Sequence, residues 1–414
     1  GHATGSNVPS GVNMIIPRLD HWFARSLAIM SSHSTLSPPQ ATAEYTYEVV
    51  DYPIPGNNRG HLHLFVGESG NPSAIIPSRT ARVVPRQLVL MMGGFPDDQS
   101  VFHPLARRLA DLPEICAVGV ICMPGFDAGR PSSSDSCTSR EHQRGGNGYS
   151  FDECATTVQN AAAALRSRYE DAPTTLTGVF HDWGVIAGLV WANRALEVEP
   201  EPSSPHRPPD RLVLLDVCAG LHPSTRTIND RSPSSTKKGG GPIRFAANWL
   251  YQIQLAMAFV LQRWGLRRIS DSVGLGLNTG SRLAPLRDVD QPYIKKLRIP
   301  EWKAGRIGCL CYPYWNIIVD GLSGKFEKTW GKHWHLPMDL HRTPVLLLTG
   351  EDKNACFHDE DAAEFLRDCG SCESKDDGEL SGGTSGSNWI CLPDAGHWLF
   401  RQHPTVCFHA IRDF

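Results

Sequence analysis

The hydrophobic positions along the chain fall into short continuous runs separated by helical patterns. Continuous apolar runs suit strands of a parallel sheet, which are buried on both faces, and they occupy residues 87–92, 117–123, 175–180, 211–217, 344–349 and 388–392. Helical periodicity follows several runs, including 99–110 and the segment to about Tyr169 that Ser150 and Glu153 open as a capping box. Strands that alternate with helices predict an α/β fold, with a mostly parallel sheet flanked by helices.

The beginning and the later part of the chain depart from this pattern. Residues 45–52 and 61–66 alternate apolar and polar positions around a loop at 53–60, which predicts an antiparallel hairpin. Between about 219 and 342, strand patterns give way to helical periodicity rich in Trp and Tyr. We expect a flexible segment at 1–43, a core formed by 44–218 and 343–414, and a helical cap at 219–342, inserted between the sixth and seventh core strands.

One junction between a strand and a helix is abrupt. The run that ends at Phe180 is followed by His181-Asp-Trp-Gly184, and a helical pattern starts at once at Val185. Such a turn strains the backbone and exposes its central side chain, here Asp182, as in the nucleophile elbow of a hydrolase. A carboxylate in this place predicts an alkyl-ester intermediate rather than acyl transfer from serine. The simpler alternative is that Asp182 only caps the following helix.

Two further segments fit a nucleophile at Asp182. His397 lies in the loop after the last predicted strand, where a general base is expected. The turn Gly93-Gly-Phe-Pro96 follows the third strand and can direct a backbone N–H into the site, so that the amides of Phe95 and Trp183 would form an oxyanion hole. A surface histidine and a plain Gly-Pro turn are the alternatives.

Three motifs together resemble those of a known family. Gly93-Gly-Phe-Pro96, His181-Asp-Trp-Gly184 and Gly396-His-Trp398 are similar to the His-Gly-x-Pro, His-Asp-Trp-Gly and Gly-His motifs of α/β-hydrolase-fold epoxide hydrolases. Haloalkane dehalogenases are close relatives of that family. The resemblance covers about Tyr45 to Phe414 apart from insertions, and it implies the α/β-hydrolase fold.

The chain departs from the family pattern at three positions. Gly93 replaces the histidine of the first motif, and Phe180 stands where the elbow usually has a small residue. The usual triad acid, three residues after the glycine that ends the seventh strand, would fall at Lys353. These departures keep open the alternative of a catalytically inactive binding protein on a hydrolase scaffold.

Two carboxylates compete for the third place in a catalytic triad. Asp352 follows the seventh strand but lies one position before the usual acid. Asp216 ends the sixth strand, where one branch of the haloalkane dehalogenases carries its acid. An ionised Asp at the end of a buried strand is costly unless a cation pairs with it, and an imidazolium would be such a partner. We favour Asp216 and keep Asp352 as the alternative.

The resemblance also implies proton donors in the cap. In epoxide hydrolases two cap tyrosines hydrogen-bond the epoxide oxygen and supply its proton. Tyr251, in Tyr251-Gln252, resembles the first, and Tyr314, or alternatively Tyr312, stands about where the second is expected. Packing is the alternative role for each of these tyrosines.

The expected activity is the opening of epoxides to diols by a hydrolase with an Asp nucleophile, acting on a small apolar substrate between core and cap. Dehalogenation by the same nucleophile is the first alternative. Trp183 could donate to a halide, but Phe95 has no side-chain donor where a second one is usually needed. We expect neither a cofactor nor a metal ion.

Composition restricts the partners and the compartment. The formal net charge of −3, without a dense Lys/Arg cluster, argues against nucleic-acid binding. The twelve cysteines are scattered along the chain, which fits buried free thiols in a reducing compartment better than a disulfide framework. Cys369-Gly-Ser-Cys372 has the spacing of a redox or zinc site, and we interpret this spacing as incidental. The uncharged run 245–262 is barely long enough to cross a bilayer, so we predict a buried lid helix, no transmembrane span and a cytoplasmic protein. The oligomeric state is left open.

Overall fold

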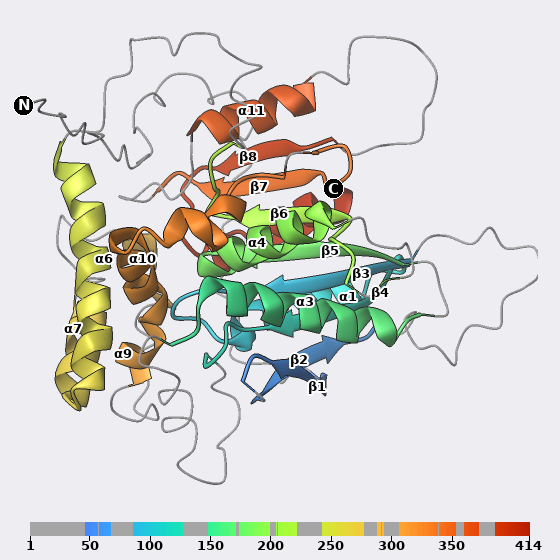
Figure 1. Ribbon diagram of the computed structural model, residues 1–414. Helices are drawn as coiled ribbons and strands as arrows, with labels where there is room; N and C mark the ends of the chain where they lie inside the picture. The colour runs from blue at the N-terminus through green and yellow to red at the C-terminus, as the bar shows by residue number, and fades with distance from the viewer. Residues whose placement is uncertain are drawn as a thin grey trace, which may run out of the picture.

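The structure is a computed structural model, drawn as a ribbon in Figure 1. It describes residues 46–56, 58–67, 86–126, 148–170, 174–198, 204, 206–221, 242–276, 288–290, 292–293, 306–337, 339–352, 360–371 and 386–414. The N-terminal segment predicted at 1–43 lies outside these residues.

The strands within these ranges form one eight-stranded sheet in the order β1-β2-β4-β3-β5-β6-β7-β8. They are β1 Glu48–Ile54, β2 Asn58–Phe65, β3 Arg86–Met92, β4 Ile115–Ile121, β5 Thr174–His181, β6 Arg211–Leu215, β7 Val345–Gly350 and β8 Asn388–Leu392. Strand β2 pairs antiparallel with β1 and β4, and the other neighbouring pairs are parallel. The prediction of a mostly parallel sheet is confirmed.

Helices cover both faces of the sheet, as Figure 1 shows. Helices α3 Phe151–Ser167, α4 Trp183–Glu197 and α11 Glu360–Ser371 share a hydrophobic core with Leu88, Leu90 and Met92 of β3. Helices α1 His103–Ala110, α12 Leu399–Gln402 and α13 Pro404–Asp413 share a second core with Val89 and Met91. Successive residues of β3 therefore point into different cores, as expected of a strand buried on both faces.

The first hairpin is tighter than the sequence predicted. The loop was expected at 53–60, but Ile54 already pairs with Asn58 across the turn. Pro53, which lacks an N–H, is tolerated inside β1 because β1 is an edge strand of the sheet.

Two other boundaries shift for local reasons. The helix predicted at 99–110 is divided into a 3-10 turn, η3 Gln99–Phe102, and α1, which has Pro104 in its first turn. Strand β6 ends at Leu215 rather than Val217, because Asp216 adopts a positive φ of 68° that ends the extended backbone. The capping box predicted for α3 is confirmed.

A group of helices and short turns connects β6 to β7. It comprises α6 Pro242–Arg263, α7 Arg267–Gly276, η4 Asp288–Asp290, α9 Arg306–Leu310, α10 Tyr312–Leu322, η5 Phe326–Lys328 and η6 Trp330–His333. Figure 1 shows α6, α7, α9 and α10 packed together at one end of the sheet. These helices fall within the predicted cap at 219–342, and the division of the chain into core and cap domains stays a prediction.

Helix α6 is buried on one side only, whereas its uncharged sequence predicted a buried lid helix. Tyr251 and Phe259 are buried, but Leu250, Ile253 and Met257 on its other side are exposed. Among the helices of the described ranges, α6 included, none is both long and apolar enough to span a bilayer. The cysteines in these ranges are free thiols, and most of them are buried, as predicted.

Candidate active site

Asp182 stands at the sharp turn between β5 and α4. Its φ of 53° and ψ of −129° lie outside the regions that residues with a side chain favour. The alternative interpretation, in which Asp182 only caps α4, requires a capping hydrogen bond from its side chain, and no such bond is present. A Cβ on Gly94 would touch Oδ2 of Asp182, and a Cβ on Gly184 would lie 2.6 Å from a carbonyl oxygen of β3. Both glycines therefore permit the close approach that forms the turn.

Two backbone amides point at the Asp182 carboxylate. The N–H of Phe95 donates to Oδ2 at 2.7 Å, and the N–H of Trp183 also hydrogen-bonds this carboxylate. Burial raises the pKa of Asp182, while the charge of His397 and the two amides act to lower it. Two backbone donors fixed at one carboxylate have the arrangement of an oxyanion hole.

His397 lies between two carboxylates. Its Nδ1 is 2.6 Å from Oδ2 of Asp216, and its Nε2 is 3.8 Å from Oδ1 of Asp182. Burial by itself would lower the pKa of His397, but the hydrogen bond and charge of Asp216, with the charges of Asp182 and Asp290, raise it to about 9. The arrangement can hold a proton on His397 and orient Nε2 toward the elbow.

The two candidate acids occupy different places. Asp216 is fully buried just beyond β6, and its carboxylate meets the imidazole. Asp352 is fixed through its backbone, since its N–H donates to the carbonyl oxygen of Ala395 at 2.8 Å. Lys353 lies outside the described residues. Nδ1 of His397, the ring nitrogen to which a triad acid would bond, is therefore bonded to Asp216.

Two of the three candidate tyrosines lie beside the elbow. The ring centroid of Tyr314, on α10, is 4.9 Å from that of Trp183 and 5.4 Å from that of Phe95. Tyr251, on α6, has its ring centroid 6.0 Å from that of Tyr314. Burial, with the nearby charge of Asp182, raises the pKa of both phenols. Both hydroxyl groups therefore keep their protons at neutral pH.

Tyr312 points elsewhere. Its hydroxyl group donates to the carbonyl oxygen of Pro124 at 3.1 Å and lies 3.7 Å from Sγ of Cys154. These contacts join α10 to the core beneath it, so Tyr312 has a packing role.

Asp290 is a site residue that the sequence analysis missed. Its Oδ1 accepts hydrogen bonds from the backbone N–H of His397 and from Nε2 of Gln402, both at 3.0 Å. It is fully buried, and these bonds hold the loop that carries His397. Asp290 belongs to no motif and precedes His397 by 107 positions, so nothing in the sequence pointed to it.

A second buried histidine and carboxylate lie behind the base. Nε2 of His181 is 3.0 Å from the carbonyl oxygen of His397, and because a carbonyl only accepts, Nε2 carries the hydrogen. Oδ2 of Asp97 is 3.7 Å from Nδ1 of His181 and accepts from Nε1 of Trp398 at 2.8 Å. Burial raises the pKa of Asp97 to about 7. His181 belongs to the His-Asp-Trp-Gly motif and Asp97 follows the Gly-Gly-Phe-Pro turn, but the sequence analysis assigned neither residue a role.

Comparison with known proteins concerns the fold. No protein-family model and no curated protein matches the sequence. Among solved structures, a loop variant of the haloalkane dehalogenase from Bradyrhizobium elkanii is similar, with a TM-score of 0.51 and 13% identity over 89% of this chain and 96% of that one. An epoxide hydrolase from metagenomes of hot environments gives a TM-score of 0.50 and 12% identity, over 89% and 98% of the two chains. The chain has the α/β-hydrolase fold.

Within this α/β-hydrolase fold, the departure from the family motifs at Phe180 has a local explanation. The ring of Phe180 lies where a Cβ on Gly178 or Gly188 would come within about 2.5 Å of its carbon atoms, so these glycines make room for the larger side chain. Phe180 is fully buried and points into the core beneath the elbow. A Cβ on Gly93 would be in ordinary van der Waals contact with Asp97, so the structure has room for a Cβ at this position.

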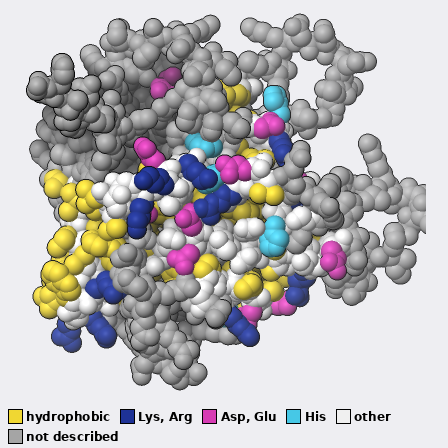
Figure 2. Space-filling model, in the orientation of Figure 1, with side chains coloured by type: hydrophobic (Ala, Val, Ile, Leu, Met, Phe, Trp, Pro, Cys, Tyr) yellow, Lys and Arg dark blue, Asp and Glu magenta, His cyan; other side chains and the backbone are white. Residues whose placement is uncertain are grey.

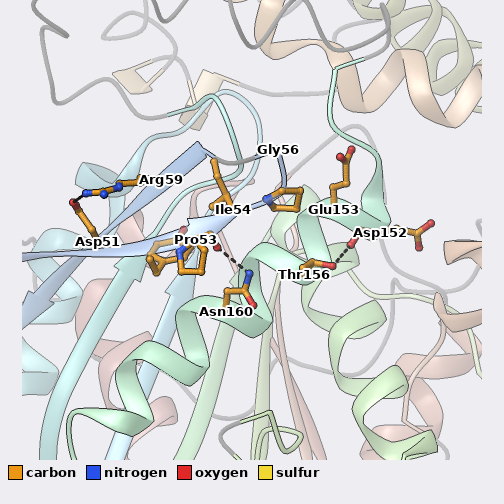
Figure 3. Close-up of a pocket in the computed structure, with 11 residues that line it drawn as sticks. Asp51, Pro53, Ile54, Gly56, Arg59, Asp152, Glu153, Thr156 and Asn160 are labelled. Carbon is orange, nitrogen blue, oxygen red and sulfur yellow. Dashed lines mark hydrogen bonds and ion pairs between the residues drawn. The ribbon is translucent and has the colours of Figure 1, made fainter.

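A pocket on the hydrolase fold lies away from these residues, between the β1–β2 turn and α3 (Figure 3). Asn160 points across it and donates to the carbonyl oxygen of Pro53 at 2.9 Å, and Arg59 pairs with Asp51. No residue of the candidate site lines this pocket. Within the described part of the chain, no cluster of three or more His, Cys, Asp or Glu residues could hold a metal ion.

Proposed function

We propose that the protein is a hydrolase that uses Asp182 as its nucleophile, and that it opens epoxides to diols through an alkyl-enzyme ester. The observation that carries the proposal is that the two carboxylate oxygens of Asp182 face different groups. Oδ2 accepts the N–H of Phe95 at 2.7 Å, while Oδ1 lies 3.8 Å from Nε2 of His397. One oxygen thus accepts a backbone amide and the other faces His397.

In the first step Oδ1 of Asp182 attacks an epoxide carbon, and the bond from that carbon to the epoxide oxygen breaks. The leaving alkoxide takes a proton from the hydroxyl group of Tyr251 or Tyr314. Both phenols are buried and protonated, and both lie close to the elbow. Proton donation by a positioned group of this kind is general acid catalysis.

In the second step His397 removes a proton from water, and the water oxygen attacks the ester carbon of Asp182. The amides of Phe95 and Trp183 stabilise the oxyanion, which collapses with cleavage of the ester bond, and the proton on His397 passes to the leaving alkoxide oxygen to give the diol. The carboxylic acid formed at Asp182 then loses the second proton of the water, which restores the tyrosine phenolate to a phenol. Esterification removes the negative charge of Asp182, which helps to raise the pKa of His397. The imidazole is therefore more readily neutral when it must act as a base.

Dehalogenation by the same nucleophile is the second candidate. Nε1 of Trp183 is buried beside the hydroxyl group of Tyr314, and its N–H could donate a hydrogen bond to a leaving halide. The tyrosines favour epoxides instead, because a halide needs no proton and an epoxide alkoxide does. The third candidate, an inactive binding protein, predicts no covalent chemistry at Asp182.

The test is the intact mass of a His397→Gln variant after mixing with a panel of epoxides and haloalkanes. The variant should gain the mass of an intact epoxide, on the peptide that contains Asp182. Addition of an alkyl group with loss of halide, without any epoxide adduct, would favour the dehalogenase. A Tyr312→Phe variant with His397→Gln serves as the matched background.

A further inference from the structure

The α6–α7 hairpin carries an apolar surface that no described segment covers. We define the hairpin stripe as its exposed apolar residues: Leu250, Ile253, Met257, Trp264, Leu266 and Ile269. Trp264 is 71% exposed, and the other five are between 43% and 53% exposed. Figure 2 shows hydrophobic side chains gathered along the edge where Figure 1 places α6 and α7, with basic side chains at its lower end. Large exposed apolar patches mark interaction surfaces.

The hairpin stripe has a fixed orientation. Its α6 members recur at helical spacing, so they lie on one side of the helix, while Tyr251 and Phe259 are buried on the other. Oγ of Ser270, on α7, donates to the carbonyl oxygen of Ala258 at 2.6 Å, and Nε2 of Gln254 donates to the carbonyl oxygen of Val273. These bonds hold the two helices together, so the residues of the hairpin stripe keep fixed positions relative to one another.

The charges at the turn of the hairpin are basic. Arg263, Arg267 and Arg268 are exposed and flank Trp264 in sequence. The single acidic residue between positions 250 and 276 is Asp271, and its Oδ1 accepts the backbone N–H of Gly308 at 3.2 Å. The acidic group is thus engaged with α9, and the arginines define the charge of the outer surface.

We propose that the α6–α7 hairpin docks the protein on anionic phospholipid bilayers. The hairpin stripe would enter the headgroup region, with Trp264 at the interface and the arginines against lipid phosphates. An amphipathic helix with Trp and apolar residues beside Arg binds such a surface without spanning it. Each Arg near an anionic leaflet strengthens this binding.

A second copy of the chain fits this surface less well. A symmetric dimer uses the same patch on both copies, so the arginines of both hairpins would meet at one interface. The hairpin offers only Asp271 to pair with them, and Asp271 is bonded to Gly308. Lipid phosphates would supply negative charge opposite Arg267 and Arg268.

Docking by α6 would also bring the bilayer to the helix whose buried side carries Tyr251. An apolar epoxide dissolved in the bilayer would then be concentrated next to this helix. This consequence rests on the proposed function, whereas the docking itself does not.

The experiment is flotation of the full-length protein with vesicles, without any substrate. Phosphatidylcholine vesicles are compared with vesicles that contain about one-third phosphatidylserine, at low and at high ionic strength. The wild-type protein should float with the anionic vesicles at low salt. Trp264→Ser and the double variant Arg267→Glu/Arg268→Glu should each lower the partition coefficient by about tenfold or more.

Matched controls lie outside the hairpin stripe. Leu322, at the end of α10, is 86% exposed, and the Arg59 side chain, on β2, is 78% exposed. Leu322→Ser and Arg59→Glu should float like wild type, and circular dichroism should report folded variants throughout. Equal flotation of hairpin and control variants would overturn the proposal. So would a wild-type dimer, detected by light scattering, that Trp264→Ser converts to a monomer. Because no substrate is used, failure of the epoxide chemistry would leave these results unchanged.

Discussion

Nδ1 of His397 lies 2.6 Å from Oδ2 of Asp216, although the two residues are 181 positions apart in the chain. Both groups are buried, and the pair turns Nε2 of the same imidazole toward Asp182, 3.8 Å away. Burial alone would lower the pKa of His397, so the rise to about 9 depends on the neighbouring carboxylates, Asp216 first. The proposed ester hydrolysis depends on this relationship.

Asp216→Asn should slow hydrolysis of the ester more than its formation. An amide cannot stabilise the imidazolium that forms when His397 takes a proton from water, and loss of such assistance costs about 10²–10⁴ in rate. The measurement is the accumulation and decay of the covalent adduct in rapid-quench experiments. Asp352→Asn is the control and should turn over normally. Normal turnover of Asp216→Asn, with a stalled ester in Asp352→Asn, would reverse our assignment of the acid.

Tyr251→Phe and Tyr314→Phe should slow ester formation from epoxides and hardly affect a haloalkane. Their phenols are the protonated groups beside the elbow, and a lost proton donor costs about 10²–10⁴ in rate. Tyr312→Phe is the matched control, because that hydroxyl group bonds to Pro124 instead. Single-turnover rates on one epoxide and one haloalkane decide the matter. Unchanged epoxide rates in both variants would exclude the tyrosines as acids.

Asp290→Asn should shift the pH dependence of ester hydrolysis toward lower pH. The variant keeps an acceptor oxygen for the N–H of His397 but loses a charge that raises the pKa of His397. A lower pKa leaves the imidazole neutral, and therefore basic, at lower pH. Asp290→Ala, which removes the acceptor, should slow hydrolysis at every pH. An Asn variant with reduced thermal stability but the wild-type pH profile would limit Asp290 to a structural role.

Asp97 should make the folded protein less stable as the pH rises toward neutrality. Its pKa rises from 3.8 to about 7 through burial. The folded chain therefore holds this proton more tightly than the unfolded chain does. The resulting contribution to the free energy of unfolding is complete below about pH 4 and is lost as the pH rises through 7. The difference of about three pKa units sets an upper limit of about 4 kcal/mol.

Thermal unfolding between pH 4 and 8 tests this effect. The melting temperature of Asp97→Asn should depend less on pH than that of wild type. Asp98→Asn, at the neighbouring cap of η3, is the control and should follow the wild-type curve. Parallel curves for wild type and Asp97→Asn would show that Asp97 titrates normally.

The fold was largely predictable because hydrophobic runs and turn residues determine it locally. The run at 388–392 and the capping box of Ser150 and Glu153 appear in the structure where the sequence placed them. The end of β6 was misjudged, because the positive φ of Asp216 leaves no mark in an apolar run. The exposed side of α6 was also missed, since an uncharged helix gives no sign of which face meets solvent.

The candidate site was predictable where residues belong to local patterns. Asp182 and His397 were found from an elbow and a loop, and Asp216 from its place at the end of a strand. The contacts of Asp290, Asp97 and His181 are created by long-range folding, such as the 3.0 Å bond from the backbone N–H of His397 to Asp290. Spacing along the chain carries no information about such contacts.

The central claim is that Asp182 attacks the substrate and forms an ester. Single-turnover hydrolysis of an epoxide in heavy-oxygen water, with enzyme in excess, tests it most directly. In the proposed mechanism the diol receives its new oxygen from the Asp182 carboxylate, and the solvent oxygen enters the enzyme, on the peptide that contains Asp182. First-turnover diol with unlabelled oxygen is the predicted result. Full incorporation of solvent oxygen into the diol in that first turnover would contradict the account.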